Sequence, residues 1–395
     1  MNLLSSEATT RAALVGTYRP AAPVFVAAEG RRLFDAEGRG YLDFASGIGV
    51  NALGYGDAGL RQAVLGALDT GLVHTSNLYR TAPAERLAAQ LVAGSFADRV
   101  FFSNSGAEAN EAAFKFARRW AGSRGGAGKH EIVALRGAFH GRLFGALAAT
   151  DRAAMQEPFA PLMPGVRFVA VDDVAALGAA VTSARTAAII AEPIQGEGGV
   201  QPLSAAFARA LRDAADDADA LLIFDEVQCG LGRTGTLYAH ELLDVTPDMV
   251  TLAKPLAGGL PMGATLVTER VAAAVQAGDH ATTFGGGPLV ASVALELVQR
   301  VSEPAFLASV RATGAHLGAC LAQLGGLAAV TAVRGVGMMW GIELARPAAP
   351  VVAAALEAGL LVTAAGTNVV RLLPPLTLTV AEADEGVALL REVLA

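Results

Sequence analysis

Short apolar runs alternate with amphipathic stretches along most of the chain after residue 60. Runs of four to six apolar residues bounded by turn residues predict buried strands. They occupy residues 99–102, 132–135, 166–171, 187–191, 221–224 and 249–253. A helical period is present over residues 84–91 and 107–120. Because buried strands separated by helices are typical of a mostly parallel sheet covered by helices, the pattern predicts an α/β fold.

The two ends of the chain follow different patterns. Residues 31–44 predict a hairpin whose turn contains glycine, residues 289–301 a long apolar helix, and residues 337–344 and 368–373 two further strands. No internal repeat or long linker is visible. We predict a large α/β domain over residues 61–285, and a smaller α+β domain built from residues 1–60 and 286–395.

Composition excludes several classes of protein. The chain has 395 residues, is 53% hydrophobic and carries a net charge of −7, which argues against disorder and against a nucleic-acid partner. The first residues lack a signal-peptide pattern, and no long stretch is free of polar residues, so we expect a cytoplasmic protein without a membrane span. Two cysteines, and six histidines without an HExxH pair, predict neither a disulfide framework nor a metal site.

Two nucleotide-binding motifs are nearly matched. The sequence GIGVNA at residues 47–52 fits a dinucleotide fingerprint, but a polar hairpin precedes it and a turn follows it, whereas the fingerprint needs a buried strand and a helix. The segment GSRGGAGKH at residues 122–130 lacks the first glycine and the final serine or threonine of a phosphate-binding loop. We interpret it as a surface loop.

The segment SNSGAEANE, residues 103–111, follows a predicted strand and opens a helix. Ser105 and Glu108 fit a capping box. The backbone N–H groups of Gly106 and Ala107 then lie at the positive end of the helix, where an anion such as a phosphate binds readily. An ordinary capped helix explains the same residues.

Asp225 and Glu226 follow the apolar run at residues 221–224. In open α/β sheets ligands bind at the carboxyl ends of strands. An acid there can hold magnesium, face a nitrogen of a heterocyclic cofactor, or simply bond turn amides. The first alternative lacks an accompanying phosphate-binding loop.

Lys254 is one of only three lysines, beside 27 arginines, and it ends an apolar run in a segment with no other charge. Desolvation lowers the pKa of a lysine and makes its amine a candidate nucleophile toward carbonyl groups. Lys115, on an amphipathic helix, and Lys129, in the glycine-rich segment, are expected to be solvated. A phosphate site, a strand-end acid and a desolvated lysine are together what a pyridoxal phosphate enzyme requires.

Six segments carry a dense resemblance to the class III, subgroup II, aminotransferases of pyridoxal phosphate-dependent fold type I. In chain order they are SNSGAEANEAAFKFAR (103–118), GAFHGR (137–142), EPIQGEGGV (192–200), FDEVQCGLGRTG (224–235), TLAKPLAGGLPMGA (251–264) and TTFGGGPL (282–289). The resemblance covers residues 15–393. Within the family, VNALG, HTSNLY, IQGEGGV and VVRLLPPL are most similar to the acetylornithine aminotransferases of arginine biosynthesis.

The resemblance implies a role for each matching residue toward the cofactor, pyridoxal 5'-phosphate. Lys254 would bond to the cofactor and shuttle a proton, Asp225 would face the pyridine nitrogen, and Gln228 would face the ring hydroxyl. Phe139 would stack on the ring. The remaining matching positions implied to contact the cofactor are Ser105, Gly106, Ala107, His140, Thr282 and Thr283, and Thr283 would reach the phosphate of a neighbouring subunit, which makes the protein a homodimer.

The resemblance also implies how substrates bind. Arg142 would bind the α-carboxylate of an acylated ornithine, and Arg371 that of 2-oxoglutarate or glutamate. Glu197 would pair with Arg371 while the ω-amine substrate is present. Ile48 stands where ornithine aminotransferases have a tyrosine that recognises a free α-amino group, which argues against free ornithine.

The expected reaction is transfer of the ω-amino group of N2-acetyl-L-ornithine to 2-oxoglutarate. The alternative substrates for the same reaction type are succinylornithine, a carrier-linked aminoadipate semialdehyde, 4-aminobutyrate and ornithine. The chain departs from the family at Gly54–Ala58, Leu143, Pro255 and Gly287, which leaves the donor open. A non-catalytic binding protein would be expected to lack Lys254 or Asp225, and a nicotinamide oxidoreductase rests only on the weak GIGVNA match.

Overall fold

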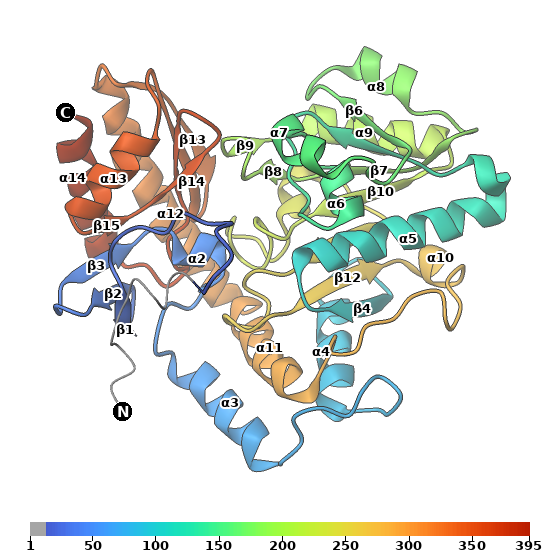
Figure 1. Cartoon of the computed structure of the whole chain (residues 1–395), viewed down its shortest axis with the longest axis horizontal. Coiled ribbons are helices and arrows are strands. Elements are labelled where there is room, and N and C mark those ends of the chain that lie inside the picture. The colour runs from blue at the N-terminus through green and yellow to red at the C-terminus, as the bar shows by residue number, and fades with distance from the viewer. Residues whose placement is uncertain (1–12) are drawn as a thin grey trace.

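The computed structural model describes residues 13–395, and it is built around a seven-stranded mixed sheet (Figure 1). All its strand pairings are parallel except those of β12, which runs antiparallel to both of its neighbours. In spatial order the strands are β4 (Arg99–Ser103), β12 (Gly263–Val267), β11 (Met249–Leu252), β10 (Leu221–Asp225), β7 (Thr186–Ala191), β5 (Glu131–Leu135) and β6 (Val166–Val169). The predicted α/β fold is confirmed, and the six predicted runs form strands, whereas β12 was not predicted.

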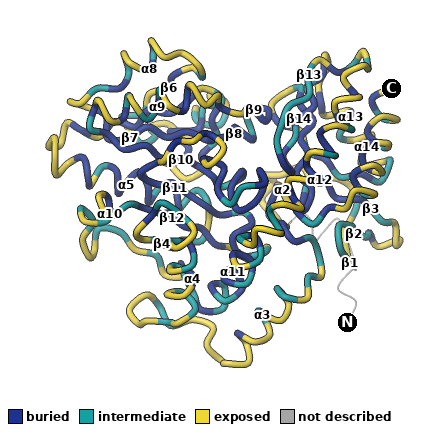
Figure 2. Tube along the Cα trace, turned by 180° about the vertical axis from the view of Figure 1, so that it is seen from behind, coloured by how far each residue is buried: buried dark blue, intermediate teal, exposed yellow. Residues whose placement is uncertain are grey.

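Both faces of this sheet are buried, because successive side chains of a strand point to opposite sides. On β10, Leu222 and Phe224 pack with α9 (Ala205–Asp217), whereas Leu221 and Ile223 pack with α5 (Gly106–Gly125). Figure 2 shows the strands as a buried layer between partly exposed helices. Because helices cover both faces of the sheet, its central strands have continuous apolar runs instead of alternating apolar and polar residues.

The smaller sheets bring the two ends of the chain together. β15 (Leu360–Leu361) pairs in parallel with β3 (Gly40–Asp43) of the predicted hairpin, which continues through β2 (Arg32–Asp35) to β1 (Phe25–Glu29). An antiparallel sheet has the order β13 (Val330–Val336), β14 (Met339–Leu344), β17 (Val369–Leu372), β16 (Thr363–Ala365). The remaining strands are β8 (Ile194–Gln195) and β9 (Gln201–Pro202).

The other helices cover these sheets or link them (Figure 1). They are α2 (Ser46–Gly49), α3 (Ala58–Asp69), α4 (Ala82–Ala93), α6 (Phe144–Ala148), α7 (Ala153–Gln156), α8 (Val174–Ala180), α10 (Glu269–Ala272), α11 (Pro288–Val301), α12 (Pro304–Ala322), α13 (Ala349–Glu357) and α14 (Val380–Leu394). Single 3₁₀ turns span Gly126–Gly128, Glu157–Phe159, Ala239–Leu243 and Gln323–Gly326. The predicted helices 84–91, 107–120 and 289–301 correspond to α4, α5 and α11.

Two local predictions are wrong. Lys129 is buried rather than solvated, because its ammonium donates to the carbonyl oxygens of Ser183 and Ala218, both at 2.8 Å. The expected capping box is only half formed: Ser105 accepts from the Glu108 N–H, but the Glu108 carboxylate accepts from Asn104 N–H instead of Ser105.

One segment of the described chain, Pro304–Gly326, is long and apolar enough to cross a membrane by length and composition alone. Its helix α12 packs against α14 and β13, and Arg311 on it donates to the Gly235 carbonyl oxygen at 2.6 Å. The helix therefore packs against the antiparallel sheet that contains β13.

Candidate active site

A cavity of about 440 Å³ opens at the carboxyl ends of β7, β10 and β11, beside the first turn of α5. Its size is that of a cofactor or substrate site. Predicted site residues that line it are Ser105, Gly106, Ala107, Phe139, His140, Arg142, Glu197, Asp225, Gln228 and Lys254. These predicted residues lie up to 149 positions apart in the chain, from Ser105 to Lys254.

Asp225 ends β10 and is held by three donors. One carboxylate oxygen accepts from His140 Nδ1 at 2.7 Å and from Asn110 Nδ2 at 2.8 Å, and the other accepts from Val227 N–H at 3.0 Å. Burial opposes a charge on His140, but the hydrogen bond and charge of Asp225 outweigh it and raise the pKa of His140. These bonds fix the carboxylate with its second oxygen free to accept once more.

Two residues of this network were missed at the level of sequence. Asn110 accepts from Thr251 Oγ1 at 2.8 Å and donates to Asp225 and to the His140 carbonyl oxygen. Glu192, the residue after β7, accepts from Phe139 N–H at 3.1 Å. A polar residue on the buried face of an alanine-rich helix, and an acid directly after a buried strand, were the available signals.

Lys254 follows β11 and faces the cavity. Burial, together with the charge of Arg371, lowers the pKa of its amine, against the opposing charges of Glu197, Asp225 and Glu192. Among residues 13–395, its amine has no hydrogen-bond partner at all. An amine in this state is available to bond to a ligand.

The first turn of α5 forms a second wall of the cavity. Ser105 caps the helix, which leaves the N–H groups of Gly106 and Ala107 without intrahelical partners. A Cβ on Gly106 would lie 2.7 Å from a methyl of Val227, and one on Gly141, at φ 133°, equally close to Ala107. Glycine at both positions therefore allows Val227 and the backbone at residue 141 to pack closely against this turn.

Glu197 and Arg371 form an ion pair of 2.5 Å at the edge of the cavity. Arg371 Nη1 also donates to Gln228 Oε1 at 3.2 Å, and its Nε donates to Thr363 Oγ1 at 3.1 Å. Burial acts to raise the pKa of Glu197, but the charge and hydrogen bond of Arg371 outweigh it and lower that pKa. Arg371 is only 1% exposed, and the charge of its buried guanidinium is balanced by the Glu197 carboxylate.

Arg142 is exposed at the mouth of the cavity, with its guanidinium carbon 5.7 Å from the centre of the Phe139 ring. Phe139 is half-buried and lines the cavity. An exposed cation at the mouth can attract an anionic substrate without a full desolvation cost.

Ile48, Thr282, Thr283 and Arg371 do not line the cavity. Ile48 lies in α2 with φ 65° and ψ 46°, an unusual conformation for a β-branched residue. Thr282 Oγ1 accepts from Asn104 Nδ2 at 3.1 Å, and Asn104 does line it. Thr283 borders a separate pocket of about 220 Å³ with residues 74–81 and 285–288.

These features define a site for a phosphorylated aldehyde cofactor, and the comparisons give its class. The family model for aminotransferase class III matches residues 17–394, and the chain belongs to this family of pyridoxal phosphate-dependent aminotransferases. The acetylornithine aminotransferase of Alnus glutinosa, a mitochondrial protein, is 50% identical over 386 residues, which are 96% of this chain and 85% of that protein.

Further relatives agree with this assignment. The acetylornithine aminotransferase of Xanthomonas campestris is 46% identical over 385 residues, covering 96% of this chain and 94% of the relative. The N-acetylornithine aminotransferase structure from Stenotrophomonas maltophilia has a TM-score of 0.83 at 38% identity, covering 95% and 96% of the two chains. The ornithine aminotransferase structure from Toxoplasma gondii reaches 0.93 at 28% identity, over 98% and 93%.

The cavity fits pyridoxal phosphate on three observations. An unpartnered amine faces the cavity from Lys254, a fixed carboxylate enters it from Asp225, and the N-terminus of α5 offers free N–H groups to a phosphate. Each matches one functional group of the cofactor.

The buried carboxyl of Glu192 gives a pH-dependent prediction. Burial, opposed by the charge of His140, raises its pKa from 4.5 to about 7. Between these values the folded protein binds a proton that the unfolded chain has released, so this group's contribution makes folding less favourable as pH rises. We expect the apoenzyme's free energy of unfolding to fall less between pH 5.5 and pH 8 in Glu192→Gln than in the wild type.

Urea unfolding of both apoproteins at the two pH values measures this difference. An equal or larger fall in Glu192→Gln would contradict the raised pKa.

Proposed function

We propose that this chain transfers the ω-amino group of N2-acetyl-L-ornithine to 2-oxoglutarate, giving the semialdehyde and L-glutamate, as a step of arginine biosynthesis. The observation that carries the proposal is the Glu197–Arg371 pair beside Lys254. One site must accept an ω-end without a carboxylate and later an α-carboxylate, and a separable ion pair can serve both. The similarity to acetylornithine aminotransferases supports this donor.

The cofactor, when bound, supplies an electron sink for the carbon next to the transferred nitrogen. Lys254 would hold the cofactor by its amine, and the same amine, when free, would serve as the base that moves the proton of the carbon next to the transferred nitrogen. Burial lowers the pKa of Lys254, which favours the neutral form of the amine that this task needs. Asp225, fixed by His140 and Asn110, holds a proton at the ring nitrogen.

The remaining assignments concern binding. The N–H groups of Gly106 and Ala107, with Ser105, hold the phosphate, while Phe139 covers the ring and Gln228 faces its hydroxyl. Thr282 supports this wall through Asn104. Arg142 binds the α-carboxylate of the acylated donor, and Arg371, once separated from Glu197, binds that of 2-oxoglutarate by its planar fork. Ile48 excludes a free α-amino group by offering it no acceptor.

The visible spectrum of the holoenzyme tests the proposed donor. We expect stepwise addition of N-acetylornithine, without an oxo acid, to remove the absorbance band of the lysine-bound cofactor. Ornithine and 4-aminobutyrate, titrated in parallel, are expected to remove it only at higher concentrations. A band that ignores N-acetylornithine but responds to another ω-amine would contradict the donor and keep the fold and cofactor.

We also propose a homodimer in the cytoplasm. Large apolar side chains are exposed on α3 and the segment that follows it, among them Leu72, Val73, Leu78, Tyr79 and, near Thr283, Phe284. Such an apolar patch is typical of a subunit interface. Thr283 sits in its pocket within this patch, where it would meet the partner's cofactor phosphate. Both cysteines are free thiols, in keeping with a reducing compartment.

Replacing Leu78 and Tyr79 by aspartate tests the interface. We expect the double variant to sediment as a monomer and to lose cofactor on dilution, while Val174→Asp, an exposed position on α8, stays dimeric. A wild-type enzyme that is monomeric yet fully active would contradict the shared site.

We also propose that residues 61–285 form the large domain and that residues 1–60 and 286–395 form the small one. The pairing of β15 with β3 supports a small domain that draws on both ends of the chain.

A further inference from the structure

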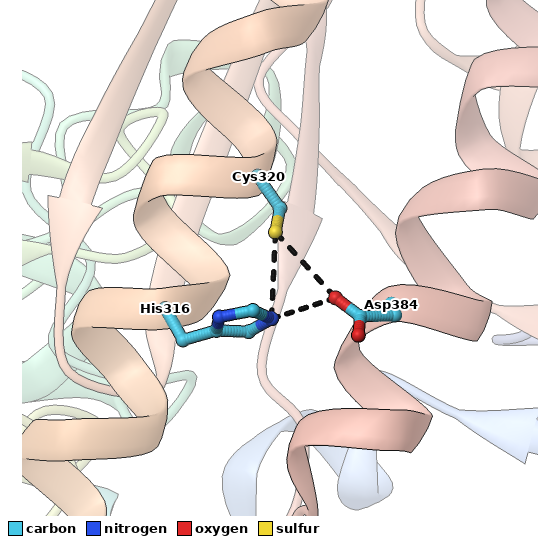
Figure 3. Close-up of side chains that lie close together, drawn as sticks. All are labelled: His316, Cys320 and Asp384. Atoms are coloured by element: carbon cyan, nitrogen blue, oxygen red, sulfur yellow. Dashed lines mark hydrogen bonds and ion pairs between the residues drawn. The ribbon is translucent and has the colours of Figure 1, made fainter.

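Three metal-ligating side chains converge between α12 and α14 (Figure 3), and none of them lines the cavity that holds Lys254. His316 and Cys320 stand four residues apart on α12, hence on one face of that helix, and Asp384 faces them from α14. The sequence alone gave no sign of this cluster, because Asp384 lies 64 positions beyond Cys320 and the two residues on α12 match no zinc motif.

The distances between the donor atoms approach those of a metal site. Cys320 Sγ lies 3.5 Å from His316 Nε2 and 3.6 Å from an oxygen of Asp384, and that oxygen lies 2.6 Å from the same nitrogen. Zinc bonds of about 2.0–2.3 Å in a tetrahedron place neighbouring ligand atoms about 3.3–3.7 Å apart. Two edges of the triangle already have this length, and only the nitrogen–oxygen edge must open, by less than about 1 Å.

The surroundings leave the ligands available. His316 and Asp384 side chains are 36% and 54% exposed, and no further hydrogen bond is recorded to their donor atoms within residues 13–395. Cys320 is half-buried between the helices and is not in a disulfide. A metal can therefore enter from solvent, and the fourth position of a tetrahedron would face water.

We propose that His316, Cys320 and Asp384 form a binding site for a transition-metal dication of the zinc class. One imidazole, one thiolate and one carboxylate suit Zn²⁺ better than Mg²⁺ or Ca²⁺, which prefer oxygen ligands alone. Binding exchanges the thiol proton, which leaves to solvent, for a sulfur–metal bond, and involves no redox change. The metal would join α12 to α14, and so clamp the small domain that carries Arg371 on β17.

Cobalt(II) is the probe for this site, because it replaces zinc and gives a thiolate-to-metal absorption band only when sulfur is a ligand. The experiment uses untagged holoenzyme with pyridoxal phosphate bound, so that the cofactor site is filled. We expect a saturable band at one cobalt per chain, displaced by Zn²⁺ and not by Mg²⁺.

Variants assign the ligands. Cys320→Ser should abolish the band although Cys229 is still present, and His316→Ala and Asp384→Asn should each weaken cobalt binding at least about tenfold. His130→Ala, an exposed histidine outside the cluster, is the matched control and should leave binding unchanged. No thiolate band in the wild type, or a band that survives in Cys320→Ser, would overturn the proposal.

A second measurement tests the clamp. Zinc at about 100 times its Kd is expected to raise the Tm of the wild-type holoenzyme by a few degrees and to leave that of Cys320→Ser unchanged. An equal rise in both proteins would place the bound zinc elsewhere and overturn the assignment.

Discussion

Lys254→Ala is expected to reduce turnover by at least about 10⁴-fold, the upper end of what a positioned proton-transfer group contributes. Lys254 is the one lysine that lines the cavity. Among residues 13–395, no other amine or imidazole both lines the cavity and has a lowered pKa. His140, the neighbouring base, is engaged with Asp225 and has a raised pKa. It cannot replace the lysine.

The loss is expected in chemistry and not in folding. Removing a cavity-facing, unpartnered amine leaves no hydrogen bond unsatisfied, and the substitution lies in a turn, two residues after the end of β11. The variant should keep the cofactor through the α5 turn and Asp225 but lose the covalent bond. Borohydride reduction followed by mass spectrometry measures this bond directly: the wild type should retain the cofactor's mass after denaturation, and the variant should not.

Lys115→Ala is the matched control. Lys115 is exposed on α5 and contacts His280 Nδ1 at 2.9 Å, outside the cavity. Its replacement should leave both turnover and the covalent bond intact. Steady-state turnover of Lys254→Ala close to that of this control would remove the lysine from the mechanism.

The sequence predicted six strands of the large sheet because each contains a short apolar run. Four of them, β5, β7, β10 and β11, are buried along their whole length. The remaining strand, β12, was hidden because it begins at Gly263 directly after a segment rich in glycine and proline. Its place is decided by pairing with β4 and β11, which local propensity does not contain.

The residues of the candidate site also fall into two groups, those that the sequence reveals and those that only the fold reveals. Lys254 and Asp225 are visible because a charged residue at the end of an apolar run is unusual and the motifs around them are dense. Asn110 and the buried state of Lys129 depend on partners far along the chain, Asp225 for the first and Ser183 and Ala218 for the second. No local pattern encodes those contacts.

Glu197→Ala is expected to change which donor the enzyme prefers. Without its carboxylate partner, Arg371 keeps only the weaker acceptors Gln228 and Thr363 and stays open to any carboxylate. The ω-end of an acylated ornithine carries no carboxylate and then meets an uncompensated buried cation. A charge-assisted hydrogen bond contributes about 1.5–3 kcal/mol, so kcat/KM for N-acetylornithine should fall about 10- to 150-fold.

The second half-reaction should respond differently. 2-Oxoglutarate, or glutamate in the reverse direction, brings its own carboxylate to Arg371 and no longer has to displace Glu197. Its kcat/KM is therefore expected to be retained or to increase. Stopped-flow measurement of each half-reaction, with N-acetylornithine or glutamate as the only donor, separates the two effects from any change in cofactor content.

A general loss of stability would lower both half-reactions together, and two controls distinguish it. Glu197→Gln keeps an acceptor without the charge and should fall between wild type and alanine. Glu131→Ala breaks another Arg–Glu pair, with Arg167 at 2.7 Å. Glu131 lies at the amino end of β5 and does not line the cavity, so this variant should leave the donor preference unchanged. If Glu197→Ala left both half-reactions unchanged, Arg371 would bind carboxylates without any need for a partner to leave, and the movable pair would have no part in the choice of substrate.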